Sequence, residues 1–480
     1  MSFRDLIDLA SERLGGSVVY ANDEFFADKG NLLKETAPVW KEHEYTDRGK
    51  WMDGWESRRK RTAGSDFALI RLGLPGIVRS VVVDTSFFRG NYPEACSIEA
   101  TSMRSDAGVD ALLSAQWREL LPRSPLEGDS RNTFEIASND AVSHLRFQIY
   151  PDGGVARLRV HGEVVPDWRL SGGLASELDL ASIEHGAGVL ACSDMFFGPK
   201  NNLIMPGRSQ NMSGGWETRR RRGPGHDWVV IRLATEGQVR RIEIDTNHFK
   251  GNYPDTASLE GSVDGLTWVE LLPRTKLQPH TRHFFIDELL ESGPLTHVRL
   301  NVYPDGGVSR LRVWGIATEQ GRRAAVVSHV NALFDFSRLQ QICPAHEWVH
   351  TLAAERPYGS WDQLVETANR AWFALNDAAR MTAYESHARI GERAAGRWSA
   401  QEQSGTRGAS EELAQALAEA NRAYEAKFGF IYLVCATGKS GDDLLADVRT
   451  RLANDRQTEL RIAAEEQAKI IALRLEKLVL

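Results

Sequence analysis

Two kinds of hydrophobic pattern divide the chain. Up to about residue 318 the apolar positions form short runs or alternate with polar ones, and Gly, Pro and Asn stand between them. Arg241–Asp245 and Arg310–Val313 alternate as half-buried strands require. Phe67–Leu72 and Ser80–Val83 are apolar runs that we expect to form two strands, separated by Leu74–Gly76. This pattern predicts all-β sandwiches of jelly-roll type.

Beyond about residue 325 the apolar positions recur at helical spacing, with Ala, Glu, Gln and Arg between them. Thr318–Arg323 is a candidate linker before this region. The last third therefore predicts a separate all-α domain, a helical bundle. The segments with the helical pattern are 330–333, 361–375, 410–428 and 444–480.

The β-type region contains an internal repeat of domain size. Two blocks recur 161 positions apart without a gap, and a third recurs 153 positions apart. The first copy has therefore gained length between the blocks, mostly near residues 103–115. A repeat this long is a duplicated domain and not a solenoid unit. The paired blocks are 54–59 (GWESRR) with 215–220 (GWETRR), 84–93 (DTSFFRGNYP) with 245–254 (DTNHFKGNYP), and 150–155 (YPDGGV) with 303–308 (YPDGGV).

Pattern and repeat together predict a multidomain chain. We expect two tandem all-β jelly-roll sandwiches at 1–165 and 183–318, joined by residues near 166–182, and an all-α helical bundle domain at 325–480. A length of 480 residues fits three domains that each bury a core.

Composition narrows the class of protein. A hydrophobic fraction of 42% and a charged fraction of 26% are those of a soluble globular protein, and a net charge of -7 favours neither nucleic acid nor an acidic membrane surface. The first residues lack the apolar run of a signal peptide, and we find no apolar run of about 18 residues, so we expect neither a secretory signal nor a membrane span. The four cysteines are scattered and fit neither a zinc pattern nor a disulfide framework, so we expect a cytoplasmic location.

The recurring blocks carry polar chemistry. Each copy has two adjacent arginines, an acid, an aspartate at a strand end, and an amide followed by tyrosine. Arginine matches a carboxylate bidentately, and Asp, Glu and Asn can bind the N–H and C=O groups of a urea or amide. The alternative is structural, because a Trp beside a Gly-rich turn usually packs and Asp-Thr after a strand often caps a turn.

These blocks, together with Ile-Arg-Leu and Arg-Leu-Arg segments, resemble the allantoicase family over about residues 15–318. The resemblance implies two jelly-roll repeats that hydrolyse allantoate to (S)-ureidoglycolate and urea. Allantoate is a carboxylate flanked by two ureido groups, which suits the polar residues of the blocks.

The resemblance gives the polar residues of the repeats hypothetical roles. Gly64-Ser65-Asp66 departs from the Gly-His-Asp common in the family, so we favour the second copy for the chemistry, where a histidine could be a general acid, a metal ligand or a packing residue. A divalent metal such as manganese is implied for some members, although no spacing of ligands here requires one. The predicted catalytic residues are His226, Asp227, Asp245 and Glu217, with Glu56, Asp84 and His248 as further candidates; the predicted substrate-binding residues are Arg58, Arg59, Arg219, Arg220, Asn252 and Tyr253.

Residues 325–480 resemble OHCU decarboxylase, where OHCU is 2-oxo-4-hydroxy-4-carboxy-5-ureidoimidazoline. The resemblance implies a catalytic pair and a carboxylate clamp that need no cofactor. Ala388 and Ile431 stand where the family usually has proline, which leaves open whether the domain is active. The implied residues are His387 and Glu402 as the catalytic pair, Arg474 as the clamp, and Ser399, Gln403 and Phe430 for the substrate's polar edge and the turn beside it.

Together the resemblances predict a bifunctional enzyme of purine breakdown that acts on the small molecules allantoate and OHCU. We expect a homo-oligomer that binds neither nucleic acid nor membrane. Two alternatives remain: an allantoicase with an inactive structural helical domain, or jelly-roll ligand-binding modules attached to an active decarboxylase.

Overall fold

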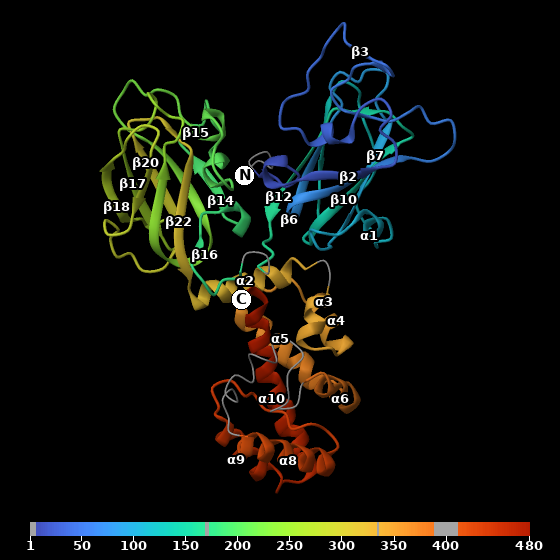
Figure 1. The fold of residues 1–480 in the computed structure, drawn as a ribbon, viewed down its shortest axis with the longest axis vertical. Helices are drawn as coiled ribbons and strands as arrows, with labels where there is room; N and C mark the ends of the chain where they lie inside the picture. The colour runs from blue at the N-terminus through green and yellow to red at the C-terminus, as the bar shows by residue number, and fades with distance from the viewer. Residues whose placement is uncertain (1–5, 169–171, 334–335, 388–410) are drawn as a thin grey trace. The chain divides into compact units, whose positions relative to one another are not determined.

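The structure is a computed structural model that describes residues 6–168, 172–333, 336–387 and 411–480. The chain forms two compact units, residues 1–334 and 335–480. The first unit contains two β-rich domains and the second is helical, as the hydrophobic pattern predicts (Figure 1).

The first β domain is an antiparallel sheet of eight strands with two small strand pairs beside it. Its main path is β1-β12-β6-β10-β7-β8, and β2 and β9 also pair with β6. Short 3-10 turns η2 (Glu12–Leu14) and η3 (Lys29–Leu33) lie between its first strands. The strands are β1 (Ile7–Asp8), β2 (Ser17–Ala21), β3 (Tyr45–Thr46), β4 (Gly49–Lys50), β5 (Trp55–Glu56), β6 (Asp66–Asp84), β7 (Ala95–Thr101), β8 (Arg118–Pro125), β9 (Arg131–Glu135), β10 (Ala141–Tyr150), β11 (Gly154–Val155) and β12 (Arg157–Val164).

The second β domain repeats this topology in the order β13-β22-β16-β20-β17-β18, with β14 and β19 also on β16. Its 3-10 turns are η4 (Ile183–His185), η5 (Lys200–Ile204) and η6 (Met212–Gly214). The strands are β13 (Leu178–Asp179), β14 (Gly188–Cys192), β15 (Trp216–Glu217), β16 (Asp227–Asp245), β17 (Thr256–Ser262), β18 (Val269–Lys276), β19 (Arg282–Phe285), β20 (Leu295–Tyr303), β21 (Gly307–Val308) and β22 (Arg310–Ala317).

The longest strand of the first β domain differs from the prediction. β6 is continuous through Leu74–Gly76, so the expectation of two separate strands was wrong. Its first part pairs with β10 and its second with β12, and Pro75 and Gly76 lie where the partner changes. The Pro75 carbonyl accepts a hydrogen bond from the Val165 N–H, and a Cβ on Gly76 would lie 2.4 Å from the Glu163 carbonyl oxygen. Glycine thus permits a close approach of the strands here.

The tryptophan of each GWE block anchors a core. Trp55 and Trp216 are fully buried, and each indole N–H donates to a main-chain carbonyl, of Asp23 and Asp194 respectively, at 2.8 Å. Burying an aromatic ring of this size stabilises a domain strongly when its N–H is satisfied.

Two insertions distinguish the first copy. One is the expected one near residues 103–115, where the β7–β8 connection carries the short helix α1 (Val109–Leu113). The other was not predicted: residues 34–54, which include the β3–β4 hairpin, stand where the second copy has only residues 205–215.

A helix follows the second sheet directly. α2 (Glu319–Asn331) packs against β16 and β22, and the Thr318 hydroxyl caps it by accepting the Gly321 N–H at 2.9 Å. A Cβ on Gly321 would lie 2.2 Å from the Glu236 carbonyl oxygen, so glycine allows this contact. Residues 318–323, expected as a linker, are therefore the cap and first turn of this helix.

The helical unit contains the predicted helix at 361–375 and divides the long pattern at 444–480. Asp455 accepts the Thr458 N–H at 2.9 Å and starts a new helix there. No described helix combines the length and the apolar character that a membrane crossing needs. The described helices are α3 (Ser337–Ile342), α4 (His346–Ala354), α5 (Trp361–Ala374), α6 (Asp377–Glu385), α8 (Glu411–Phe428), α9 (Gly441–Arg451) and α10 (Arg456–Glu476), followed by the 3-10 turn η8 (Lys477–Val479).

Candidate functional sites

The recurring blocks meet at one end of each β domain. In the second copy Asp227 pairs with Val302 and Asp245 pairs with Arg310, so both ends of β16 lie beside the 303–308 turn. The first copy has the same register. Blocks that are far apart in sequence are therefore neighbours in space.

The predicted acids at this end have the same kinds of partner in both copies. Glu217 accepts from the Asn252 amide at 2.5 Å, as Glu56 does from Asn91 at 2.8 Å. Burial raises the pKa of Glu56, and the Asn91 hydrogen bond opposes this shift. Asp227 is buried and forms a 2.5 Å ion pair with Arg221, which corresponds to Asp66 with Lys60.

The predicted arginines lie on the surface. Arg58 and Arg219 pair with Asp23 and Asp194, and their guanidinium groups lie over phenylalanine rings. Arg59 and Arg220 are exposed, and Tyr253 is half-buried.

His226 belongs to a polar network at the same end. Its Nε2 lies 3.3 Å from the Asn301 Oδ1, and its ring contacts Tyr303. Asn301 in turn donates to Glu260 at 2.7 Å. The first copy builds the corresponding network with serine and glutamine in place of His226 and Asn301.

His248 has a left-handed backbone, φ 72°, as Phe87 has in the first copy. Its Nε2 lies 2.9 Å from the Ser209 carbonyl oxygen. The backbone conformation therefore belongs to the fold, whereas the imidazole is particular to the second copy.

A pocket of about 320 Å³ lies on the outer face of the second sheet. Side chains alternate along β16 and β22, so Ile244 and Leu311 face the core. Their neighbours Glu243, Asp245, Arg310 and Arg312 face outward. Of the predicted residues in the β domains, Asp245 alone lines this pocket. The lining residues are Asp179, Ser182, Glu184, His185, Pro206, Gly207, Arg208, Glu243, Asp245, Arg282, Arg310, Arg312 and Trp314.

Arg310 is the buried cation of this pocket. Its Nε and Nη1 donate to main-chain carbonyls that include those of Asn202, Gly207 and Gly214. Among the described residues it forms no ion pair. Burial, with Arg312 and Arg13 nearby, lowers its pKa to about 10, and Asp245 opposes this shift. A buried guanidinium bonded only to neutral groups favours a bound anion.

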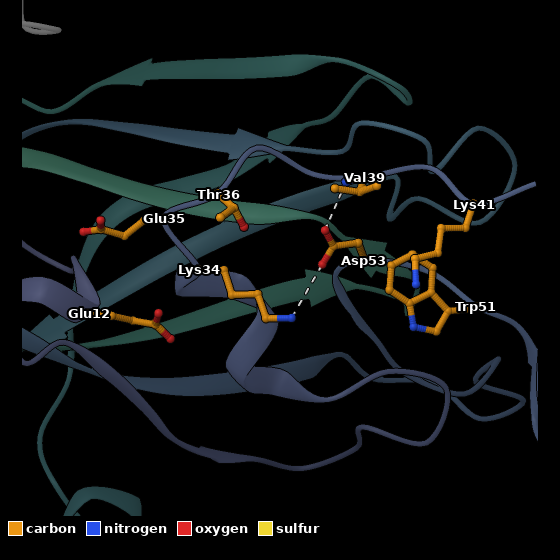
Figure 2. A pocket seen from close by; sticks show the side chains of 8 residues that line it. All are labelled: Glu12, Lys34, Glu35, Thr36, Val39, Lys41, Trp51 and Asp53. Carbon is orange, nitrogen blue, oxygen red and sulfur yellow. Dashed lines mark hydrogen bonds and ion pairs between the residues drawn. The ribbon is translucent and has the colours of Figure 1, made fainter. Parts of the chain in front are cut away.

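Arg157 is the counterpart of Arg310 in the first copy, and it pairs with the carboxylate of Asp53. Arg157 donates to the Asp53 Oδ2 at 2.8 Å, and the Lys34 ammonium lies 3.8 Å from Oδ1. Burial raises the pKa of Asp53, but the bonds from Arg157 and the Val39 N–H outweigh it and hold the pKa low. Figure 2 shows Asp53 between Lys34 and Val39, in a pocket of about 450 Å³.

Among the described residues, no carboxylate of the second copy pairs with Arg310 as Asp53 pairs with Arg157. Gly214 precedes the GWE block where Asp53 stands in the first copy, and Met205 replaces Lys34 after the 3-10 turn. The insertion at residues 34–54 supplies Asp53. The carboxylate beside the buried arginine therefore occurs in the copy with the longer loop.

Acids also line the second pocket. Glu243, which replaces Val82, accepts hydrogen bonds from the Arg282 Nε and Nη2 at 2.5 and 2.8 Å. This contact raises the pKa of Arg282. Burial raises the pKa of Asp179, which accepts two main-chain N–H groups and lies 3.4 Å from Arg312. Arginines beside acids can bind a carboxylate together with N–H groups.

Sequence reasoning missed most of this pocket. Arg310 and Arg312 belong to an Arg-Leu-Arg block that both copies share, so the repeat gave no reason to single them out. The available signal was the difference between copies: Glu243 and His185 stand where the first copy has Val82 and Leu14.

The helical unit brings two of its predicted residues together. The Arg474 Nη2 lies 3.2 Å from the His387 Nδ1, and Arg474 is buried. Phe430 is buried against Tyr384 and Tyr424. The remaining predicted residues, Ser399, Glu402 and Gln403, lie outside the described residues, as does Ala388.

Two further polar side chains are buried near this pair. Gln467 lies two helical turns before Arg474 on the same face of α10, and it is fully buried. Tyr384 is buried on α6 and contacts Trp372, which donates to the Ala464 carbonyl of α10. Within the described residues, neither the Gln467 amide nor the Tyr384 hydroxyl has a hydrogen-bond partner. Burial raises the pKa of Tyr384 to about 12.

In the part of the chain that the structure describes, no three His, Cys, Asp or Glu side chains could hold a metal ion together. The metal implied by the family resemblance therefore has no ligand set among these residues.

Comparison with known proteins identifies both regions. The allantoicase repeat model matches residues 7–165 and 178–318. The chain belongs to the allantoicase family. A probable allantoicase of Pseudomonas fluorescens (strain SBW25) is 49% identical over 324 residues, which cover 65% of this chain and 97% of that protein. The allantoicase of Dictyostelium discoideum is 48% identical over 64% of this chain and 86% of its own length.

Structural comparison agrees for the allantoicase repeats. The crystal structure of allantoicase from Saccharomyces cerevisiae is 37% identical, covers 64% of this chain and 92% of its own, and superposes with a TM-score of 0.57. The OHCU decarboxylase model matches residues 335–476. Two allantoicase repeats are thus followed in one chain by an OHCU decarboxylase domain.

Proposed function

We propose that the chain is a bifunctional enzyme of purine breakdown. The β domains hydrolyse allantoate to (S)-ureidoglycolate and urea, a linear-amidine C–N hydrolysis, and the helical domain decarboxylates OHCU to (S)-allantoin. The two family matches and the polar sites in both regions support this assignment.

The finer architecture belongs to the same proposal. We assign a jelly-roll sandwich to each β domain, at 7–165 and 178–318, and a helical bundle to the unit 335–480. We place the enzyme in the cytoplasm, which suits its four free cysteines. It is a homo-oligomer that acts on small molecules and binds neither nucleic acid nor membrane, and the decarboxylase needs no cofactor.

The allantoicase assignment rests on one difference between the copies. Arg157 forms an ion pair with a carboxylate, whereas Arg310 forms none among the described residues. In the first copy Asp53 supplies that carboxylate from within the chain. In the second copy the carboxylate of allantoate takes this place, held by Arg310 and the neighbouring Arg312. Glu243 and Asp245 lie on the same face, where they can accept the N–H groups of the two ureido arms.

Such a site promotes hydrolysis by positioning the substrate and by transferring a proton. Arginines that fix the carboxylate place the central carbon of allantoate against the acidic side of the pocket. The site then needs a group that moves a proton to the departing urea nitrogen, because urea leaves poorly as an anion.

In the helical domain Arg474 holds the carboxylate of OHCU and His387 lies against the reacting carbon. Loss of carbon dioxide leaves an electron pair that spreads into the ring, and the carbon then takes up a proton. The contact between Arg474 and His387 puts the clamp and the proton-transfer group in one place. Gln467 and Tyr384 offer the unpaired donors and acceptors that the ring and ureido groups need.

The experiment is direct. Purified protein is incubated with allantoate, with and without chelator and added manganese, and urea and ureidoglycolate are measured; OHCU decay is followed separately. We expect turnover of both substrates. Absence of urea release under every condition would favour binding modules over an allantoicase, and absence of OHCU turnover would favour a structural helical domain.

A further inference from the structure

The pocket of the second β domain contains one histidine. His185 is the last residue of η4, a 3-10 turn that Ser182 caps at its start and Gly186 ends with a left-handed backbone, φ 92°. The turn fixes where the side chain leaves the backbone. His185 lines the pocket together with Arg310, Glu243 and Asp245.

Its hydrogen bond defines which ring nitrogen is basic. The Nδ1 lies 2.9 Å from the main-chain carbonyl oxygen of Asp179. A carbonyl oxygen only accepts, so Nδ1 carries the proton and Nε2 has the free lone pair. Within the described residues Nε2 forms no hydrogen bond. The ring stacks on Trp168 with centroids 5.9 Å apart, which holds its orientation.

The fold does not require an imidazole here. The first copy has the same turn with the same kinds of cap, Ser11 and Gly15, and ends it with Leu14, which is buried. Leucine therefore fits the turn. The histidine occurs in the copy whose buried arginine lacks an internal carboxylate, and it lines the same pocket.

We propose that His185 is the acid–base residue of allantoate hydrolysis; this inference rests on the allantoicase function proposed above. The water oxygen bonds to the central carbon of allantoate as the bond from that carbon to one ureido nitrogen breaks. His185 Nε2 takes a proton from the water and gives it to the nitrogen of the departing urea. The imidazole ends neutral, and the products are ureidoglycolate and urea.

The test compares two histidines with matched main-chain contacts. His161 in the first copy is half-buried, and its Nδ1 lies 3.2 Å from the Leu6 carbonyl oxygen. We expect His185→Gln to lower kcat for allantoate about 100- to 10,000-fold, the usual contribution of a positioned acid–base group, with KM changed less than about threefold. His161→Gln keeps the wild-type kcat.

A second variant separates catalysis from folding. His185→Leu installs the residue that the first copy uses in the same turn, so we expect native thermal unfolding together with the same loss of kcat. We expect the dependence of kcat on pH to differ between the wild-type protein and both His185 variants.

The outcomes are distinguishable. Wild-type urea release with unchanged kcat in His185→Gln overturns this inference and leaves the allantoicase function standing. A rise in KM alone assigns His185 to binding and also overturns it, as does a changed dependence of kcat on pH in His226→Ala but not in His185→Gln. If the wild-type protein itself releases no urea, the proposed function fails first.

Discussion

At the scale of single residues, the duplication provides an internal comparison. Positions that keep the same kind of partner in both copies, such as Glu56 with Asn91 and Glu217 with Asn252, are explained by the fold. Arg157 and Arg310 have the same main-chain role but differ in their access to a carboxylate. That difference is the strongest residue-level evidence for where the substrate binds.

Lysine at these two positions tests the carboxylate site. Both substitutions remove guanidinium bonds to main-chain carbonyls, so we expect similar losses of stability. We expect Arg310→Lys to raise KM for allantoate about 10- to 100-fold, because a charge-assisted hydrogen bond contributes roughly 1.5–3 kcal/mol. Steady-state kinetics and thermal unfolding of both variants check this. An equal rise in KM for Arg157→Lys would place the carboxylate site elsewhere.

At the scale of elements, the sequence predicted strand and helix types better than their extents. Strict alternation located the strands at Arg241–Asp245 and Arg310–Val313. Pro75 and Gly76 suggested a break between two strands, and this prediction was wrong. The partner of β6 changes there from β10 to β12, while β6 itself continues. Pairing across a sheet depends on residues far along the chain, which a local pattern does not contain.

The candidate sites also depend on residues that lie far apart along the chain. His387 and Arg474 were predicted from a family resemblance, and the structure brings them together. The pocket of the second β domain was missed except for Asp245, because it collects residues from β13, β16, β19, β22 and the loops between them. Only the sheet register places these residues on one outer face.

The edge strand β1 gives a stability prediction. Asp8 accepts the Ala10 and Val160 N–H groups at 3.1 and 2.9 Å. Burial raises its pKa, against the opposing effects of the Val160 N–H and Arg159. The unfolded chain therefore releases this proton at lower pH than the folded one, so Asp8 lowers the free energy of unfolding as pH rises from about 3.8 through the folded pKa.

We expect Asp8→Asn to remove this part of the pH dependence. The free energy of unfolding of the variant minus that of wild type rises with pH across this window and is constant on either side of it. Denaturant unfolding at a series of pH values, monitored in the first β domain, measures the difference. A difference that falls with rising pH would mean that the folded pKa is lowered.

A substitution in helix α10 is expected to raise stability and to lower activity. Gln467 is fully buried, and its amide has no hydrogen-bond partner among the described residues; such a group costs about 1–3 kcal/mol. We expect Gln467→Met, of similar volume, to stabilise the helical unit by a comparable amount and to lower kcat/KM for OHCU at least tenfold. Thermal unfolding and OHCU decay measure the two effects. Stabilisation with full activity would show that the amide does not contact substrate.

At the scale of the whole molecule, the two reactions do not follow one another directly. The helical domain produces allantoin, whereas the β domains consume allantoate, so a ring-opening hydrolysis must act between them. The intermediate therefore leaves this protein, and coupling of the two sites would bring no transfer of product. We propose that fusion in one chain instead fixes the ratio of the two activities.

Independence of the halves is the final prediction. Arg474 is buried in the helical unit, so Arg474→Gln removes the charge that we propose holds the OHCU carboxylate. We expect kcat/KM for OHCU to fall at least 100-fold, since removing a buried charged hydrogen bond costs about 3 kcal/mol or more, while urea release from allantoate is unchanged. Arg310→Lys serves as the reciprocal control, with its effect confined to allantoate. Both activities are measured on each full-length variant, and a parallel loss of both in either variant would show that the two units depend on one another.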